Sequence, residues 1–537
     1  MPASKPLVDH LVESFVARGV KRMFGVPGGG SSLDLIRAAE SRGIPFVLAR
    51  HETSAAIMAL ATGEIDAAPG VALTTIGPGL ANAVNGMACA TLDRAPLCLV
   101  SDGHSPQLTR FVTHQVFDQA ALSAPVVKGQ THLDGDDPVG EVEHLLDLAQ
   151  TPPYGAVHVE LSGAMARRPV SHASTKRRPK DWQRDHEGIH RAQELLARAA
   201  RPVVVVGLEA CAPSFAKAVR RFCGRLACPV LVTYKAKGVV SDSDPQTIGI
   251  FTGGALEAIC MESADLLVLI GLDPVELIPQ AWRYHAPVLD IGLVPRPIHY
   301  VQPAVGLYGP LATILEALGA VGTAGGWRAE EPLAFRTEMR SRLVTASGEG
   351  VSPQRAVELT LAASPRHLRP RITVDAGAHM FPVTAFWECD APRDLLISNG
   401  LATMGFALPA AIGAGLADPA RKVVAFTGDG GLAMCIGELL TARQQNVALV
   451  VVVFNDGAIS LIDIKQQARG MPSEGVRWER PDFARVAEGF GLKTWRARSE
   501  AEYREAIAAA LAVDGPALVD VHIDPTGYLE QIRALRG

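Results

Sequence analysis

The sequence is poor in the features that mark several specialised classes of protein. Only 5% of its 537 residues are aromatic, 20% are charged, and the formal net charge is -5, so no polyanionic partner such as nucleic acid is implied. No segment approaches the ~18 unbroken apolar residues of a membrane-spanning helix, and residues 1–19 lack the apolar core of a signal peptide. We therefore expect no nucleic acid partner, no membrane association and a cytoplasmic location.

Closely spaced cysteine pairs are also missing. Eight cysteines are scattered without any Cys-x-x-Cys spacing, mostly in apolar surroundings. Disulfide frameworks and most cysteine metal sites need closer or more regular spacing. We interpret all eight as reduced core residues.

Alternating strand and helix patterns are abundant. The run "RPVVVVG" from Arg201, followed by the helical pattern from Pro213, is typical of the βαβ units of a parallel sheet. A basic segment from Ala166 and a segment rich in glycine and charge from Gly322 suggest linkers. The fold class is predicted to be α/β. The predicted divisions are a first domain (1–165), a linker (166–185), a central domain (186–322), a second linker (323–350) and a third domain (351–537).

The first and third domains resemble each other. "VALTTIGPGLAN" from Val71 and "VVAFTGDGGLAM" from Val423 are each a strand, a glycine-rich turn and the start of a helix. Duplication explains this economically, although any two βαβ units look somewhat alike. The third domain has Asp429 where the first has Gly77, so only the third can hold a cation at this turn.

Polar residues follow two neighbouring strands of the third domain. Asp429 ends one strand, and Asn455 ends the next. The carboxyl ends of parallel strands meet at one edge, so the two side chains are expected to converge with the carbonyl of Gly457 into a Mg²⁺ site. Gly428, Gly430 and Gly431 leave backbone N–H groups open for phosphate oxygens. Alone, Gly-Asp-Gly would more simply be a tight turn.

The spaced pair of motifs resembles the diphosphate and Mg²⁺ motif of thiamine diphosphate enzymes. In that family Gly-Asp-Gly is followed about one βαβ unit later by Asn, matching Gly428, Asp429, Gly430 and Asn455. Asp456 stands where many members carry a second Asn. The resemblance implies thiamine diphosphate and Mg²⁺ as cofactors.

The first domain resembles the pyrimidine-binding domain of the acetolactate synthase and pyruvate oxidase group. The matching segments are "GVPGGG" at Gly25, "RHE" at Arg50 and "GPGLAN" at Gly77. The resemblance makes Glu52 the acid that protonates the aminopyrimidine ring; alone, it would be a helix-start Glu favoured by the helix dipole. The implied cofactor contacts are Gly25, Pro27, Gly28, Glu52, Gly77, Gly79 and Asn82.

Three further segments extend the resemblance. Met404 occupies the place of the apolar residue that wedges between the two cofactor rings, although it could be core filler. His379 lies in "DAGAHM", which matches the loop that reaches the diphosphate, with Ala378 where the family has Gln. "HQVFDQ" nominates Gln115 beside the reacting carbon, with His114 where acetolactate synthases have Phe. This pair could equally be a polar surface loop.

The resemblance implies three doubly wound parallel-sheet domains. The first binds the pyrimidine ring of the cofactor, the second is the central domain, and the third binds the diphosphate. It implies a decarboxylating carboligase acting on a small-molecule 2-oxo acid, or alternatively a simple decarboxylase or acyloin lyase. A flavin-dependent oxidase or a silent cofactor-binding subunit is a weaker alternative. Leu-Asp-Pro from Leu272 stands where FAD-binding relatives place Arg-Phe-Asp, which weighs against FAD. A homodimer or homotetramer with sites at the subunit interface is expected.

Overall fold

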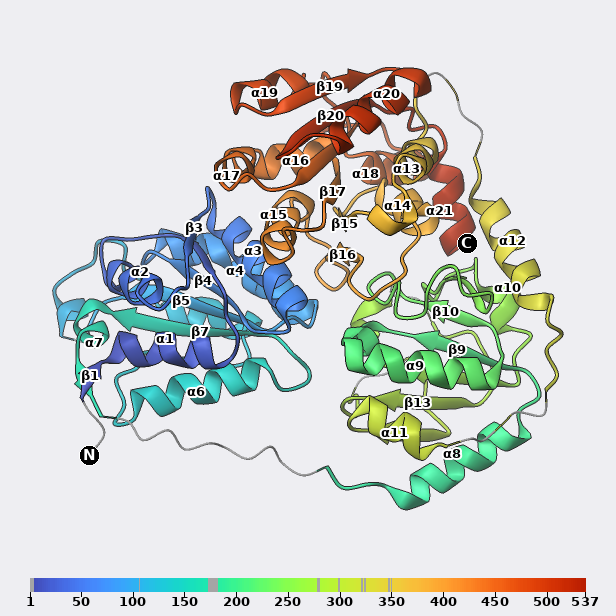
Figure 1. Cartoon of the computed structure of the whole chain (residues 1–537), viewed down its shortest axis with the longest axis horizontal. Helices are drawn as coiled ribbons and strands as arrows, with labels where there is room; N and C mark the ends of the chain where they lie inside the picture. Colours follow the sequence, from blue (N-terminus) through green and yellow to red (C-terminus); the bar gives the residue numbers. More distant parts are fainter. Residues whose placement is uncertain are drawn as a thin grey trace.

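The computed structural model contains three six-stranded sheets, and the strands of each are parallel throughout. Figure 1 shows them as three lobes, which we call the first (residues 5–170), central (186–318) and third (353–536) lobes. The structure describes residues 4–105, 107–171, 182–277, 281–297, 300–319, 322, 325–345, 348 and 350–537.

The first lobe has helices on both faces of its sheet. Its strands are β2 (Met23–Val26), β3 (Phe46–Leu48), β4 (Gly70–Thr74), β5 (Leu97–Gly103), β6 (Gln130–Thr131) and β7 (Ala156–Ser162). Its helices are α1 (Leu7–Ala17), α2 (Ser31–Glu40), α3 (Glu52–Asp66), α4 (Pro78–Leu92), α5 (Gln119–Ser123), α6 (Pro138–Ala149) and α7 (Gly163–Ala166). Two short strands, β1 (Lys5–Pro6) and β8 (Pro169–Val170), pair antiparallel outside this sheet.

The central lobe is built on strands rich in valine and leucine, as burial on both faces of a parallel sheet requires. Its strands are β9 (Pro202–Val206), β10 (Val230–Val232), β11 (Thr247–Ile250), β12 (Leu266–Ile270), β13 (Val288–Gly292) and β14 (Val305–Tyr308). Its helices are α8 (His186–Arg198), α9 (Pro213–Leu226), α10 (Ala258–Met261) and α11 (Leu311–Ala317).

The third lobe completes the chain. Its strands are β15 (Arg371–Val374), β16 (Leu395–Ile397), β17 (Val423–Gly428), β18 (Leu449–Asn455), β19 (Lys493–Ala497) and β20 (Ala517–His522). Its helices are α13 (Pro353–Ala362), α14 (Met380–Phe386), α15 (Ala407–Ala417), α16 (Asp429–Cys435), α17 (Glu438–Gln444), α18 (Ser460–Ala468), α19 (Phe483–Gly489), α20 (Glu500–Leu511) and α21 (Tyr528–Arg536).

The order of strands relates the first and third lobes. The sheets run β3-β2-β4-β5-β7-β6 and β16-β15-β17-β18-β20-β19, which is one order when each lobe is numbered from its own first strand. β4 and β17 then correspond, as do the turns that follow them at Gly77 and Asp429. This agreement supports the duplication inferred from sequence. The central sheet has a different order, β11-β10-β9-β12-β13-β14.

The predicted linkers contain regular structure. The first, 166–185, includes β8 as well as the start of the connection to α8, and its residues 172–181 lie outside the described part. The second, 323–350, includes α12 (Glu331–Leu343), which packs on β11 and α21; residues 323, 324, 346, 347 and 349 lie outside the described part. The charged and glycine-rich composition of this segment did not indicate α12, because only a few positions of that helix are buried.

One apolar core joins the first and third lobes. Helices α3 and α15 lie side by side at their junction (Figure 1), and both contribute buried alanines and larger apolar residues to it. A Cβ added at Gly413 of α15 would lie 2.3 Å from the carbonyl oxygen of Met58, so the two helices are in close contact. The first and third lobes of one chain are therefore a single packed body.

A buried polar cluster connects the central lobe to the first and third lobes. Asp93 of the first lobe accepts hydrogen bonds from the backbone N–H groups of Asn399 and Gly400 in the third lobe, both at 2.8 Å. Lys235 of the central lobe donates to Glu64 at 3.1 Å and to the Asp93 carbonyl at 3.0 Å. All three lobes thus meet at one group of charges.

Candidate active site

A pocket opens at the carboxyl edge of the third sheet, where β15, β17 and β18 end. Ligands of parallel α/β sheets bind at this edge. The residues that line it are 376–379, Met404, 428–431, Phe454, Asp456, 458–461 and Tyr528. Every one belongs to the third lobe.

At the pocket, Gly431 leaves no room for a side chain and Gly430 leaves little. A Cβ on Gly431 would lie 2.2 Å from Oδ2 of Asp375, and a Cβ on Gly430 would lie 3.3 Å from Cε of Met404. The backbone therefore reaches the pocket surface itself, as binding of a phosphate group requires.

Asp375 holds the walls of the pocket together. It is fully buried and accepts hydrogen bonds from the backbone N–H groups of Gly405 and Phe406, at 3.1 and 3.0 Å, and from the Thr427 hydroxyl at 2.9 Å. Burial raises its pKa to about 6. These bonds fix the loop that carries Met404 against the end of β17.

Asp429 and Asp456 form a coupled pair of acids at the pocket. Asp429 accepts hydrogen bonds from the backbone N–H groups of Gly430 at 2.7 Å and Gly457 at 2.8 Å, and Asp456 accepts one from the Ser460 hydroxyl at 2.5 Å. Burial, reinforced by repulsion from Asp456, raises the pKa of Asp429 to about 7, and burial raises that of Asp456 to about 6. Neither forms an ion pair with a described residue, although the nearby Arg480 charge partly offsets the effect of burial on the pKa of Asp456.

Asn455 does not line this pocket. Its amide nitrogen donates to the Pro481 carbonyl and to Oδ1 of Asp520, both at 2.9 Å, and its buried Oδ1 has no hydrogen-bond partner among the described residues. Adjacent residues of a strand point in opposite directions, so Asp456, not Asn455, lies at the pocket. The structure therefore corrects the predicted convergence of Asn455 with Asp429.

Gly457 also differs from its predicted role. Its backbone N–H donates to Asp429, and its φ of 74° is a left-handed conformation that suits glycine. Its carbonyl oxygen, predicted to be a metal ligand, already accepts a hydrogen bond from the Trp478 N–H at 2.9 Å. Gly457 instead positions Asp429.

His379 also lines the pocket. Its ring stacks on Phe454 with centroids 5.5 Å apart, and a Cβ on Gly428 would lie 3.3 Å from it. Burial lowers its pKa to about 4, and Nε2 has no hydrogen-bond partner among the described residues. A buried neutral imidazole with one unsatisfied nitrogen suits a polar ligand.

Tyr528 of α21 lines the pocket too, and the sequence offered no signal for it. It lies about 70 residues beyond the acidic pair and belongs to no recognised motif. The side chain is buried, and burial together with Asp456 and Asp429 raises its pKa well above the usual range, so the phenol keeps its proton. It can donate a hydrogen bond into the pocket.

Glu52 lies in the first lobe, at the start of α3. It is 8% exposed, and its Oε2 accepts a hydrogen bond from the Asn82 amide at 3.0 Å. Gly79 lies beside it, since a Cβ there would be 3.5 Å from Oε1. The structure thus brings Glu52, Gly79 and Asn82 together, but none of them lines the third-lobe pocket of the same chain.

Gly77 and Gln115 lie against each other in the first lobe. Gly77 has a φ of 68°, and a Cβ there would be 2.5 Å from the Gln115 carbonyl oxygen. Gln115 itself is left-handed, with a φ of 60°, and exposed, as is His114. Gln115 therefore lies next to the first-lobe set, in a backbone conformation unusual for its residue type.

The remaining predicted residues, Gly25, Pro27 and Gly28, lie at the end of β2. A Cβ on Gly28 would lie 2.2 Å from Oδ2 of Asp102, so this position needs glycine. They share the carboxyl edge of the first sheet with the residues that follow β4.

Other kinds of site are not found in the described part of the chain. No group of three or more His, Cys, Asp or Glu side chains there could hold a metal ion, and no described helix is long and apolar enough to cross a membrane. All eight cysteines are free.

Three family models match the chain in order. The N-terminal TPP binding domain of thiamine pyrophosphate enzymes matches residues 6–122, the central domain matches 189–318, and the C-terminal TPP binding domain matches 375–521. Thiamine pyrophosphate, or TPP, is thiamine diphosphate under another name.

Similar proteins cover almost all of the chain. The acetolactate synthase of Bacillus subtilis is 28% identical, with 96% of this chain and 93% of the relative covered. The catabolic acetolactate synthase of Raoultella terrigena is 29% identical, covering 96% and 94%. The acetolactate synthase isozyme 3 large subunit of Escherichia coli is 30% identical, covering 90% and 88%.

Proposed function

The chain belongs to the thiamine pyrophosphate enzymes, and from that premise we propose that it decarboxylates a 2-oxo acid and joins the remaining fragment to a second carbonyl compound. It is an acetolactate synthase-like carboligase that forms carbon–carbon bonds. The observation that carries the proposal is the third-lobe pocket, where a glycine surface, a histidine nitrogen without a described partner and two buried acids without a described ion pair meet.

The pocket fits the diphosphate end of the cofactor. Gly430 and Gly431 present backbone to it, and Nε2 of His379 and the hydroxyl of Tyr528 can each bond an oxygen. Asp429 and Asp456 are hard oxygen ligands suited to Mg²⁺, which would neutralise both the acids and the diphosphate. We propose this pair as the metal ligands in place of Asn455 and the Gly457 carbonyl.

The first lobe supplies the proton chemistry in this proposal. Bound thiamine diphosphate provides a carbon nucleophile that attacks the carbonyl of the 2-oxo acid. Glu52 would hold a proton at the aminopyrimidine ring, with its Oε2 oriented by Asn82. Met404, fixed through Asp375, would separate the two cofactor rings, and Gln115 would lie beside the reacting carbon, with His114 at the acceptor side.

We further propose that each site is completed by a second copy of the chain, in a homodimer or homotetramer. The third-lobe pocket is lined by the third lobe alone, while Glu52 lies in the first lobe and outside it. A two-fold axis can bring the first lobe of one protomer to the pocket of its partner and form two equivalent sites. The proposed domain limits remain 1–165, 186–322 and 351–537, and the eight free thiols suit the reducing cytoplasm.

The proposal is tested by product analysis. The purified protein is incubated with thiamine diphosphate, Mg²⁺ and a panel of 2-oxo acids, and CO₂, aldehyde and acyloin-type products are quantified. The carboligase predicts CO₂ together with a coupled product. Aldehyde as the sole organic product would make the chain a simple decarboxylase, and no turnover of any 2-oxo acid would leave a silent binding subunit.

A further inference from the structure

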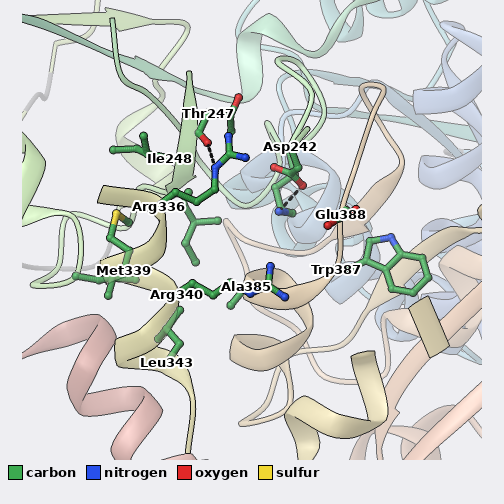
Figure 2. A pocket seen from close by; sticks show the side chains of 14 residues that line it. Asp242, Thr247, Ile248, Arg336, Met339, Arg340, Leu343, Ala385, Trp387 and Glu388 are labelled. Atoms are coloured by element: carbon green, nitrogen blue, oxygen red, sulfur yellow. Dashed lines mark hydrogen bonds and ion pairs between the residues drawn. The ribbon is translucent and has the colours of Figure 1, made fainter. Parts of the chain in front are cut away.

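We propose that a second cavity, between the central and third lobes, binds a short aliphatic carboxylate. It has a volume of about 110 Å³ and lies between β11, α12 and the end of α14 (Figure 2). It has no lining residue in common with the cofactor pocket. The inference does not rest on the proposed reaction.

The two acids that line the cavity already have cationic partners. Asp242 pairs with Lys237 at 2.7 Å in a largely buried ion pair, shown by a dashed line in Figure 2. Glu388 pairs with Arg369, which is not part of the cavity lining, at 3.3 Å. Each acid is therefore already paired with one cation, although both also act on the charge of Arg336.

Two guanidinium groups of α12 remain without a carboxylate. Arg336 donates to the backbone carbonyls of Thr247, at 2.6 Å, and Asp244. Arg340 lies over the ring of Phe386 at 5.1 Å. Neither forms an ion pair with any carboxylate in the described residues, and the cavity lining as a whole holds three cations against two acids.

Trp387 closes one side of the cavity. It is 1% exposed, and its Nε1 is itself buried, so it offers a ligand no hydrogen bond. The indole is held in place by an edge contact with Phe426, with ring centroids 5.8 Å apart. Trp387 therefore adds a rigid, largely apolar side to the cavity.

The rest of the lining is apolar and limits the size of the ligand. Ile248, Ile250, Leu256, Met339 and Leu343 form this wall. A nucleotide is too large for a volume of about 110 Å³. A bare metal ion is excluded because the charged groups of the lining without an ion pair are the two arginines, which are cations. A carboxylate head bonded by the arginines, with a tail of a few carbons against the wall, satisfies both conditions.

Binding is tested by isothermal titration calorimetry on the full apo chain, with isovalerate as the probe. Isovaleramide has the same shape without the charge, and inorganic phosphate has the charge without the tail. The proposal expects saturable binding of isovalerate, with binding of the amide and phosphate at least tenfold weaker. Absence of saturable isovalerate binding, or equal binding of either comparison compound, would overturn it.

Variants locate the site. Arg340→Gln should weaken isovalerate binding roughly tenfold, because a charge-assisted bond is lost. Arg342→Gln is the matched control, since Arg342 lies on the same helix, pairs with the exposed Glu338 and does not line the cavity. Arg340 is exposed, so its replacement should not disturb folding. Undiminished affinity in Arg340→Gln would reject this cavity as the site.

Discussion

At the scale of single residues, we expect Asn455 to contribute to stability and its neighbour Asp456 to contribute to cofactor binding. Asp456→Ala should weaken Mg²⁺-dependent binding of thiamine diphosphate by about tenfold or more, as Asp429→Ala should, because each removes a proposed metal ligand. Asn455→Ala should leave binding nearly unchanged but lower the free energy of unfolding by ~1–3 kcal/mol, since Asp520 loses a buried donor. Calorimetry with and without Mg²⁺, and urea unfolding, distinguish the two. Equal loss of cofactor binding in both variants would favour the original prediction of Asn455.

Glu52 can be tested without disturbing its packing. Glu52→Gln should bind cofactor and fold normally, but turnover should fall on the order of 100-fold to 10,000-fold because the proton donor is lost. The direct measurement is deuterium exchange at the thiazolium C2 of bound cofactor. An unchanged exchange rate would exclude the assigned role, and Glu40→Gln on the exposed side of α2 serves as the control.

The sequence predicted some of these residues better than others, for physical reasons. Glu52, Asp429 and the glycines belong to short sequence motifs that resemble those of a known family, so a local pattern was enough to nominate them. Asn455 and Asp456 are neighbours, and which one points to the pocket depends on how the end of β18 packs against Asp520. Tyr528 reaches the pocket through tertiary packing of a distant segment, which no local pattern records.

At the scale of elements, the contact between α3 and α15 depends on a missing side chain. Gly413→Ala should lower the free energy of unfolding by ~1–3 kcal/mol, because the new Cβ would force apart two packed helices. Gly224→Ala on α9 is the matched control: a Cβ there meets nothing within 4 Å, and the change should stabilise by about 0.5–1 kcal/mol. Urea unfolding measures both. Equal effects at the two positions would mean that the α3–α15 contact is not tight.

The carboxyl edge of the central sheet is closed by a buried acid. Glu276 accepts hydrogen bonds from the Leu208 N–H at 2.9 Å and from the Thr233 hydroxyl at 2.5 Å. Burial raises its pKa to about 8. The folded chain therefore keeps a proton near pH 7 that the unfolded chain releases. A sheet of this strand order often binds dinucleotides at this edge, and here the acid takes up the backbone donor instead.

The pH dependence of stability should report this proton. Between the ordinary glutamate pKa and about 8, the free energy of unfolding should fall as pH rises, with Glu276 contributing up to ~1.4 kcal/mol per pH unit. Below that window the contribution is constant, since the acid is protonated in both states. Glu276→Gln is neutral throughout and should flatten the slope, although it starts less stable. Identical slopes for wild type and variant between pH 5.5 and 7.5 would show that Glu276 is ionised when folded.

At this scale the sequence predicted most of the fold. Alternating β-branched runs and amphipathic segments predicted parallel α/β domains, and burial of each sheet on both faces explains why that pattern is strong. The order of strands, the α3–α15 core and helix α12 depend on contacts between distant segments, so the pattern could not supply them.

At the scale of the whole molecule, sites shared between protomers can be tested by complementation. Inactive Glu52→Gln and inactive Asp429→Ala chains are mixed under conditions that allow subunit exchange. A shared site lets a mixed dimer assemble one intact pair, so activity should return to roughly a quarter of wild type for equal random mixing. Sites contained within single chains would remain inactive in every mixture, which would reject the shared site.

The core shared by α3 and α15 also determines the order of events during synthesis. Met58 and Gly413 are about 350 residues apart, so at ~5–20 residues per second the ribosome takes tens of seconds to deliver the second helix after the first. Throughout that interval the surface of α3 that contacts α15 has no native partner in its own chain, although its other contacts lie within the first lobe. The nascent first lobe should therefore be a client for chaperones that shield apolar surface, and truncated products that end before α15 should aggregate rather than accumulate as folded fragments.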